Sequence, residues 1–260
     1  MLRKFLLPVL FLAVAATSAA QAQTKSRLNQ ILERGSIRVG TTGDFNPMSV
    51  RDPATNSFKG FDVEAAEELA KDMGVKVEFV QAEWPTLIAG VVSNKYDIFM
   101  GGSSMNMARA RTVGFTLPYT EAGTLPLVLK DNAGKFKTWG DVNQAGIKVA
   151  VTLGTVFEEQ ARMHFPKAQI VAVQPPAAGY QEVMARRADV TITSNVEASQ
   201  LVQRYDQLVI TARDEPRNRR PFAYMAAQDD VVWLNFLNSW VTMKKADGYF
   251  ERLEAKWMPR

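Results

Sequence analysis

The sequence predicts an α/β protein made of two similar lobes joined by two crossing strands. Strand-like and helix-like segments alternate along the chain, which is typical of parallel sheets with right-handed crossover connections. The alternation occurs once in residues 37–100 and again in residues 147–192. Ligands of such sheets bind outside the carboxyl ends of the strands, so we expect a binding cleft between the lobes.

The two stretches share one order of elements. The first contains a strand at 37–40, a helix over 61–73, a strand at 75–80, a helical segment at 85–92 and a strand at 96–100. The second contains a strand at 147–151, a turn at Gly154-Thr155 with a helix through Arg162, a strand at 169–173, a helix at 180–185 and a strand at 188–192.

Two apolar runs, residues 123–129 and 221–226, are suited to crossing between the lobes. We therefore expect residues 23–123 with 225–260 to form lobe 1 and residues 124–224 to form lobe 2. Residues 231–257 carry apolar side chains at helical spacing, which we interpret as core packing: Trp233, Phe236, Leu237, Trp240 and Met243.

The first 22 residues have the features of a cleaved signal peptide. Arg3 and Lys4 precede an apolar run over 5–16, and Ala20-Gln21-Ala22 is a small-x-small cleavage site. The run is shorter than the roughly 20 residues that a helix needs to span a bilayer. The sequence has no cysteine, which excludes disulfides and a lipid-modified cysteine. These features predict a protein exported to the periplasm.

Charge and motifs exclude several classes of function. The chain has 31 Lys and Arg against 27 Asp and Glu, and this small excess argues against nucleic-acid binding. The basic cluster at 217–220 lies near Pro216 and Pro221, and we expect it to be a solvated loop. His164 is the only histidine, which argues against a zinc site or a histidine-dependent triad. Gly101-Gly102 lacks the spacing of a phosphate-binding loop, so we expect no metal and no cofactor.

Five segments of the chain resemble the periplasmic solute-binding proteins of family 3, the polar-amino-acid type. They read RVGTTGDFNPMS, GFDVEAAEELA, WPTLI, YDIFMGGSSMNMARAR and VGFTLPY. Within that superfamily, TTGDF, WPTL, SMNMARAR and NVEA are most similar to the cyclohexadienyl dehydratases, exported enzymes built on the same fold. The resemblance implies a type II periplasmic-binding-protein fold, in which two lobes close on a ligand around a hinge of two strands.

The resemblance also implies ligand contacts, residue by residue. Arg109 stands where the family places the arginine that holds a ligand carboxylate in a bidentate manner. Ser104 matches the hydroxyl that assists this arginine. Thr155 can offer its hydroxyl and backbone donors to an anion, or it can simply cap a helix. Phe45 and Trp84 match the aromatic residues that clamp a ligand.

Asp44 is expected to organise its own turn. At two other positions the chain departs from the family. Ser194 stands where amino-acid-binding members usually have an Asp that accepts the ligand ammonium group. Val156 stands where those members favour Thr and the dehydratases carry Asn. The resemblance therefore implies that carboxylate recognition is kept, whereas ammonium recognition is altered unless Glu197 takes over the charge.

Three interpretations of Glu197 remain open. The spacing of Ser194 and Glu197 fits a capping box at a helix start. Alternatively, Glu197 reaches the cleft as a ligand acceptor. The dehydratase resemblance implies a third role, a general acid whose pKa is raised by its enclosure.

The predicted function is a receptor that captures a small carboxylate and presents it to an ABC transporter in the inner membrane. The predicted ligand-binding residues are Arg109, Ser104, Phe45, Trp84, Thr155 and Ser194. The alternative is a dehydratase acting on prephenate or arogenate with Glu197 as its catalytic residue.

Overall fold

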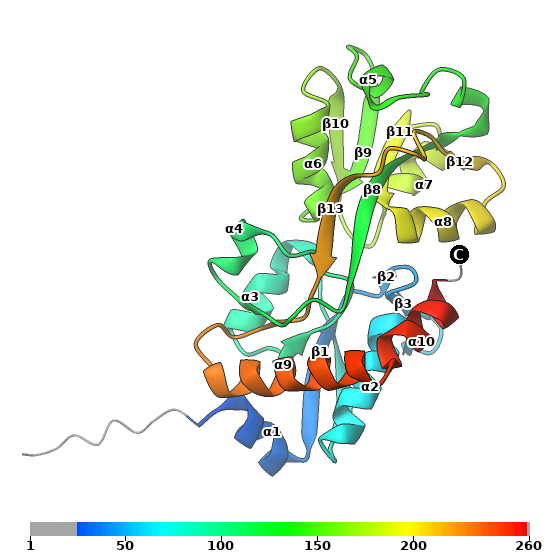
Figure 1. Cartoon of the computed structure of the whole chain (residues 1–260). Coiled ribbons are helices and arrows are strands. Elements are labelled where there is room, and N and C mark those ends of the chain that lie inside the picture. Colours follow the sequence, from blue (N-terminus) through cyan, green and yellow to red (C-terminus); the bar gives the residue numbers. More distant parts are fainter. Residues whose placement is uncertain (1–24, 259–260) are drawn as a thin grey trace, which may run out of the picture.

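The computed structural model describes residues 25–258 and contains two lobes, each built on its own sheet (Figure 1). Three strands at one side of the lobe 1 sheet are parallel. The next strand, β14, comes from late in the chain and pairs with the nearest of them in the antiparallel direction. Its order is β5 (Lys76–Gln81), β1 (Ser36–Thr41), β6 (Ile98–Phe99), β14 (Met225–Ala226) and β7 (Gly114–Phe115). The predicted signal peptide lies outside the described residues.

The lobe 2 sheet follows the same plan, with three parallel strands and antiparallel partners beyond them. Its order is β10 (Gln169–Val173), β9 (Lys148–Thr152), β11 (Val190–Ser194), β8 (Thr120–Leu129) and β12 (Leu208–Ile210), while β13 (Arg217–Phe222) also pairs with β8. This arrangement confirms the predicted α/β architecture of two lobes.

Helices cover both sheets, and a small hairpin sheet lies beside lobe 1 (Figure 1). Lobe 1 carries α1 (Arg27–Arg34), α2 (Phe61–Asp72), α3 (Leu87–Val92) after the short 3-10 turn Trp84–Thr86, α4 (Met107–Ala110), α9 (Val231–Ala246) and α10 (Tyr249–Trp257). Lobe 2 carries α5 (Trp139–Val142), α6 (Val156–His164), α7 (Gly179–Met184) and α8 (Asn195–Arg204). The hairpin sheet contains β2 (Asp44–Phe45), β3 (Ser49–Arg51) and β4 (Phe58–Lys59).

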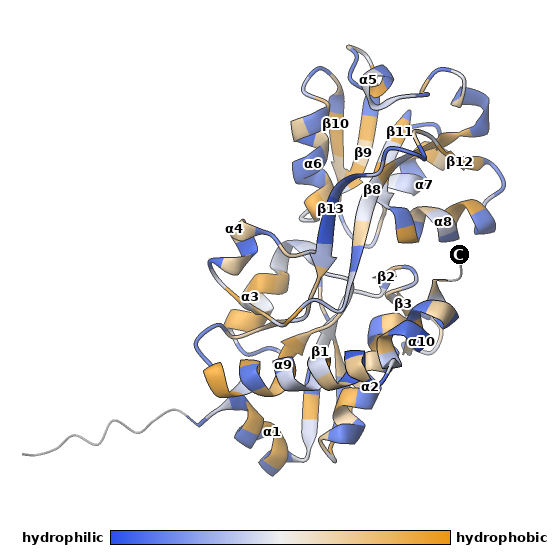
Figure 2. Ribbon diagram, in the orientation of Figure 1, coloured by the Kyte–Doolittle hydropathy of each residue, from blue (hydrophilic) through white to orange (hydrophobic). Residues whose placement is uncertain are grey.

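The two crossings between the lobes run side by side as an antiparallel pair, β8 and β13 (Figure 1). The prediction of a loop at residues 217–220 was wrong, because these residues begin β13. The strand is hydrophilic along much of its length (Figure 2), and its pairing is interrupted near Asn218, which has a φ of 50°. Arg217 lies 4.8 Å over the Trp139 ring of lobe 2, and Arg219 forms an ion pair with Glu121 of β8 at 2.6 Å.

The last predicted helical segment is two helices, broken at Gly248, whose φ of 74° is favourable only for glycine. Trp233, Leu237 and Trp240 are buried as expected, whereas Met243 is 65% exposed and does not belong to the core. No helix among residues 25–258 combines the length and apolar character needed to cross a membrane.

Candidate functional site

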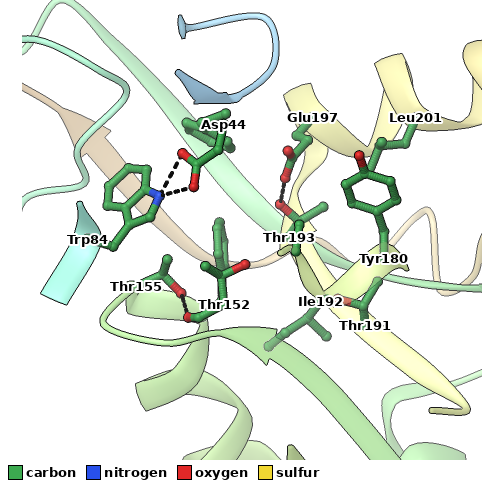
Figure 3. Close-up of a pocket in the computed structure, with 14 residues that line it drawn as sticks. Asp44, Trp84, Thr152, Thr155, Tyr180, Thr191, Ile192, Thr193, Glu197 and Leu201 are labelled. Carbon is green, nitrogen blue, oxygen red and sulfur yellow. Dashed lines mark hydrogen bonds between the residues drawn. The ribbon is translucent and has the colours of Figure 1, made fainter. Parts of the chain in front are cut away.

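A cavity lies between the lobes and is lined from both sides (Figure 3). It has about 430 Å³ of empty space. Lobe 1 contributes Asp44, Phe45 and Trp84. Lobe 2 contributes Thr152, Thr155, Phe157, Ala178, Gly179, Tyr180, Thr191, Ile192, Thr193, Glu197 and Leu201.

The lobe 1 wall consists of an aromatic pair and a carboxylate. Phe45 and Trp84 pack edge to face with ring centroids 6.0 Å apart. The Trp84 indole Nε1 donates to both oxygens of Asp44, at 3.0 and 3.2 Å (Figure 3). Burial raises the pKa of Asp44, although these hydrogen bonds oppose the shift. Sequence reasoning assigned Asp44 to its own turn and therefore missed its carboxylate as part of the cavity.

A second, smaller chamber of about 230 Å³ adjoins the first and contains Arg109. The two chambers share Phe45, Trp84, Thr155 and Phe157. The remaining lining residues of the second chamber are Gly102, Ser104, Arg109 and Val156. Five of the six predicted ligand-binding residues therefore lie around these two adjoining chambers.

Arg109 is 7% exposed, and its guanidinium is poorly satisfied by protein. Within residues 25–258 its hydrogen bonds are two long ones, to the carbonyl oxygens of Ser104 and Gly154, both at 3.3 Å. Burial lowers the pKa of Arg109 to about 10, so the side chain is charged at neutral pH. The charge of Glu159 raises the pKa of Arg109, but among residues 25–258 no carboxylate forms an ion pair with it, and an anionic ligand would satisfy this buried cation.

The loop before α6 brings lobe 2 against lobe 1. Gly154 has a φ of 77°, and a Cβ there would lie 2.6 Å from the backbone nitrogen of Pro85. Thr155 is the N-cap residue of α6, but its hydroxyl donates to the Thr152 carbonyl oxygen at 2.7 Å instead of capping the helix. Its hydroxyl is therefore held in place at the junction of the two chambers.

Glu197 belongs to α8 and is 8% exposed. Its backbone N–H donates to the Ser194 hydroxyl at 3.0 Å, which forms one half of a capping box. Its carboxyl group instead shares a hydrogen bond with the Thr193 hydroxyl and faces the cavity (Figure 3). Burial, together with the nearby Asp44 charge, raises the pKa of Glu197 to about 8, although the Thr193 contact opposes the shift.

Ser194 is the predicted site residue that the structure does not bring to either chamber. It is 2% exposed and caps α8. Conversely, Phe157 and Tyr180 line the first chamber and were missed. Phe157 contacts Phe45 of the other lobe, with ring centroids 6.4 Å apart, a pairing that no local pattern reports. Tyr180 begins a predicted helix, and burial raises its pKa to about 12.

His164 lies away from both chambers, where its Nε2 is 2.7 Å from the Asn218 side-chain nitrogen and its ring packs on Trp139. Among residues 25–258, no group of three or more His, Cys, Asp or Glu side chains could hold a metal ion.

Comparison with known proteins identifies the family. Residues 37–260 match the family model of the bacterial extracellular solute-binding proteins, family 3. The chain belongs to this family. Two curated relatives of this solute-binding protein have different activities. Cyclohexadienyl dehydratase of Pseudomonas aeruginosa is 30% identical over 247 residues, covering 95% of this chain and 91% of the relative. The L-cystine-binding protein TcyJ of Escherichia coli is 29% identical over 257 residues, covering 98% and 95%.

Solved structures show that the solute-binding protein has the type II periplasmic-binding-protein fold. The ancestral amino acid-binding protein AncCDT-1, a precursor of cyclohexadienyl dehydratase, superposes with a TM-score of 0.84 at 37% identity, covering 90% of this chain and all 100% of that one. A P235GK mutant of ArgBP from T. maritima superposes with a TM-score of 0.82 at 27% identity, with the same coverage.

Proposed function

We propose that this protein is a periplasmic receptor that captures a small, amino-acid-like carboxylate and presents it to an ABC permease. Family 3 membership, the predicted signal peptide and the two-lobed fold support this proposal. Relatives named as an L-cystine-binding protein and as a probable amino-acid ABC transporter-binding protein also support it.

The observation that carries the proposal is the state of Arg109. Its guanidinium is buried beside an enclosed chamber and has only two long hydrogen bonds within residues 25–258. Two carboxylate oxygens in that chamber would replace weak carbonyl contacts by charge-assisted bonds. Ser104 and Thr155 border the same chamber, and the Ser104 hydroxyl can assist in orienting the anion, whereas the Thr155 hydroxyl already donates to the Thr152 carbonyl oxygen.

The adjoining chamber is suited to the rest of the ligand. Phe45, Trp84 and Phe157 provide apolar walls, and Asp44 and Glu197 provide two acidic groups. Asp44 can accept from a ligand amine, which is the task that family members give to an Asp at the position of Ser194. Altogether the site fits a molecule with its carboxylate at Arg109 and its polar or basic groups at Asp44 and Glu197.

Isothermal titration calorimetry with the purified mature protein tests the proposal. The panel should contain polar amino acids, including L-cystine and L-arginine, each paired with its carboxamide derivative. We expect one or more acids to bind, and the matched amide to bind about 100-fold more weakly because it lacks the charge that Arg109 requires. Equal affinity for acid and amide would remove carboxylate recognition from the proposal.

One observation favours a second candidate, a dehydratase. A glutamic acid with a pKa of about 8 keeps its proton at neutral pH and could protonate a leaving hydroxyl. Against this, Val156 offers no polar group in the Arg109 chamber, where the dehydratases carry Asn. Incubation with prephenate should therefore give no enzyme-like formation of phenylpyruvate, and rapid formation would make the dehydratase the better assignment.

A further inference from the structure

Asp62 is a buried acid that has no part in the chambers described above. It lies in the first turn of α2 and is completely inaccessible to solvent. Its Oδ2 accepts a hydrogen bond from the Gly102 backbone N–H and another from the Tyr119 hydroxyl at 2.8 Å. Its Oδ1 is buried and has no hydrogen-bond partner within the described residues.

These contacts connect three segments that matter for binding. Gly102 lines the Arg109 chamber, and a Cβ at this position would lie 2.5 Å from the Phe45 ring. Tyr119 directly precedes β8, the first crossing between the lobes. Tyr224 lies between β13 and β14, at the end of the second crossing, and stacks on Tyr119 with ring centroids 4.3 Å apart.

No cation among the residues that the structure describes forms an ion pair with Asp62. Burial raises its pKa to about 7, while the Gly102 and Tyr119 hydrogen bonds and the nearby Tyr224 hydroxyl lower it. Tyr224 faces the carboxyl group but makes no hydrogen bond of regular geometry with it. Burial also raises the pKa of Tyr119, Tyr224 and the neighbouring Tyr249 above the ordinary value, so the titratable groups facing Asp62 stay neutral and protonated.

We propose that Asp62 is a positioning residue that ties the Gly102 segment of the binding chamber to the two crossings between the lobes, and that neutralising Asp62 loosens this tie. A hydrogen bond to a carboxylate is stronger than one to a neutral acid or amide. The ionised form therefore holds Gly102 against Phe45 and holds Tyr119 at the start of β8. The protonated form holds both less firmly, so opening at Gly102 that leaves Asp62 buried is easier below the pKa of Asp62, whereas burial of the charge makes lobe 1 as a whole less stable above that pKa.

Amide hydrogen exchange at Gly102, followed by NMR in the ligand-free mature protein, tests this proposal. The protection factor removes the intrinsic dependence of exchange on pH, and the Val39 amide in β1 reports opening of lobe 1 as a whole. Relative to Val39, Gly102 should be on the order of tenfold better protected at pH 8.5 than at pH 5.5. Because the experiment uses no ligand, a negative result would not contradict the proposed receptor function. A negative result in the binding experiments would likewise not contradict the role of Asp62.

Asp62→Asn has nearly the same shape but cannot ionise. At both pH values, Gly102 in this variant should show the low protection that the parent shows at pH 5.5. Glu67→Gln, at an exposed position on the same helix as Asp62, is the control and should behave like the parent. Tyr119→Phe keeps the ring stack but removes a donor to the carboxylate, so the midpoint should move to higher pH by about one unit. This second variant carries the test if Asp62→Asn does not fold. Protection at Gly102 that is independent of pH in the parent, or a midpoint unmoved by Tyr119→Phe, would overturn the proposal.

Discussion

The guanidinium of Arg109 donates a hydrogen bond to the carbonyl oxygen of Gly154 at 3.3 Å, and this contact joins the two lobes directly. Arg109 belongs to α4 of lobe 1, and Gly154 precedes α6 of lobe 2. The residue expected to hold the ligand carboxylate thus also contacts the opposite lobe. Ligand binding and closure of the lobes should therefore depend on the same two residues.

Arg109→Lys should weaken binding of the ligand found by the amino-acid panel. Lysine keeps the charge, but it cannot form two parallel hydrogen bonds to a carboxylate. We expect a loss of about 1.5–3 kcal/mol, or roughly 10- to 150-fold in Kd, measured by calorimetry. Exposed Arg111→Lys, two residues away, is the matched control and should bind like the parent. An unchanged Kd in the Arg109 variant would remove Arg109 from the site.

Gly154→Ala should prevent full closure of the lobes. The added Cβ would lie 2.6 Å from Pro85 N and 2.7 Å from its Cα, backbone atoms that cannot move aside, and a φ of 77° is unfavourable for alanine. Small-angle scattering should show that saturating ligand compacts the parent but not this variant. Gly134→Ala, which meets no atom within 4 Å, is the control. A variant that compacts like the parent would show that this contact is not needed for closure.

Local sequence patterns predicted several elements with accurate bounds. The strand at Gln169–Val173 has the predicted bounds, and Arg109 is buried beside a chamber as its motif indicates. Ser194 and Glu197 formed only half of the predicted capping box, because Thr193 contacts the carboxyl group that would have completed it. The contact between Thr193 and the Glu197 carboxyl group depends on tertiary packing around the cavity. The sequence of residues 194–197 does not determine that packing.

Contacts between the lobes were beyond local patterns. Phe157 meets Phe45 only because α6 closes on the hairpin sheet, and their separation in the sequence exceeds 100 residues. Asp44 was assigned to its turn because Asp is common in turns, and only the Trp84 hydrogen bonds show its place in the cavity wall. The family motifs pointed to Arg109 and left the role of Glu197 open, while the place of Asp44 in the cavity wall came from the structure.

Glu197→Gln should stabilise the protein at alkaline pH. Folding raises the pKa of Glu197 to about 8, so the folded state binds the proton more tightly than the unfolded state. The stability that this proton contributes is fully present below the unfolded pKa and is lost as pH rises through about 8. The Gln variant keeps the backbone donor for Ser194 and loses this dependence. Its Tm should equal that of the parent near pH 4 and exceed it by roughly 10–20 °C at pH 9.

Exposed Glu251→Gln on α10 provides the matched control for that experiment, and its Tm should follow the parent at every pH. A Tm difference for Glu197→Gln that is constant with pH would mean that Glu197 acts through its cap alone. Loss of ligand affinity at neutral pH without change in Tm would instead favour direct contact between the Glu197 carboxyl group and the ligand.

Asp44→Asn should lower the pH at which this stabilisation is lost. The Asp44 charge, which comes from the opposite lobe, raises the pKa of Glu197, and an amide of the same shape removes that repulsion. The Trp84 indole can still donate to the amide oxygen, so the wall of the chamber should keep its geometry. Glu197→Gln is made both in the parent and in the Asp44→Asn variant, and the Tm gained by this substitution is measured against pH in each. The pH midpoint of this gain should be lower in the Asp44→Asn background than in the parent. An unmoved midpoint would show that the two carboxyl groups do not interact, and closure would then bring no acid pair together across the cleft.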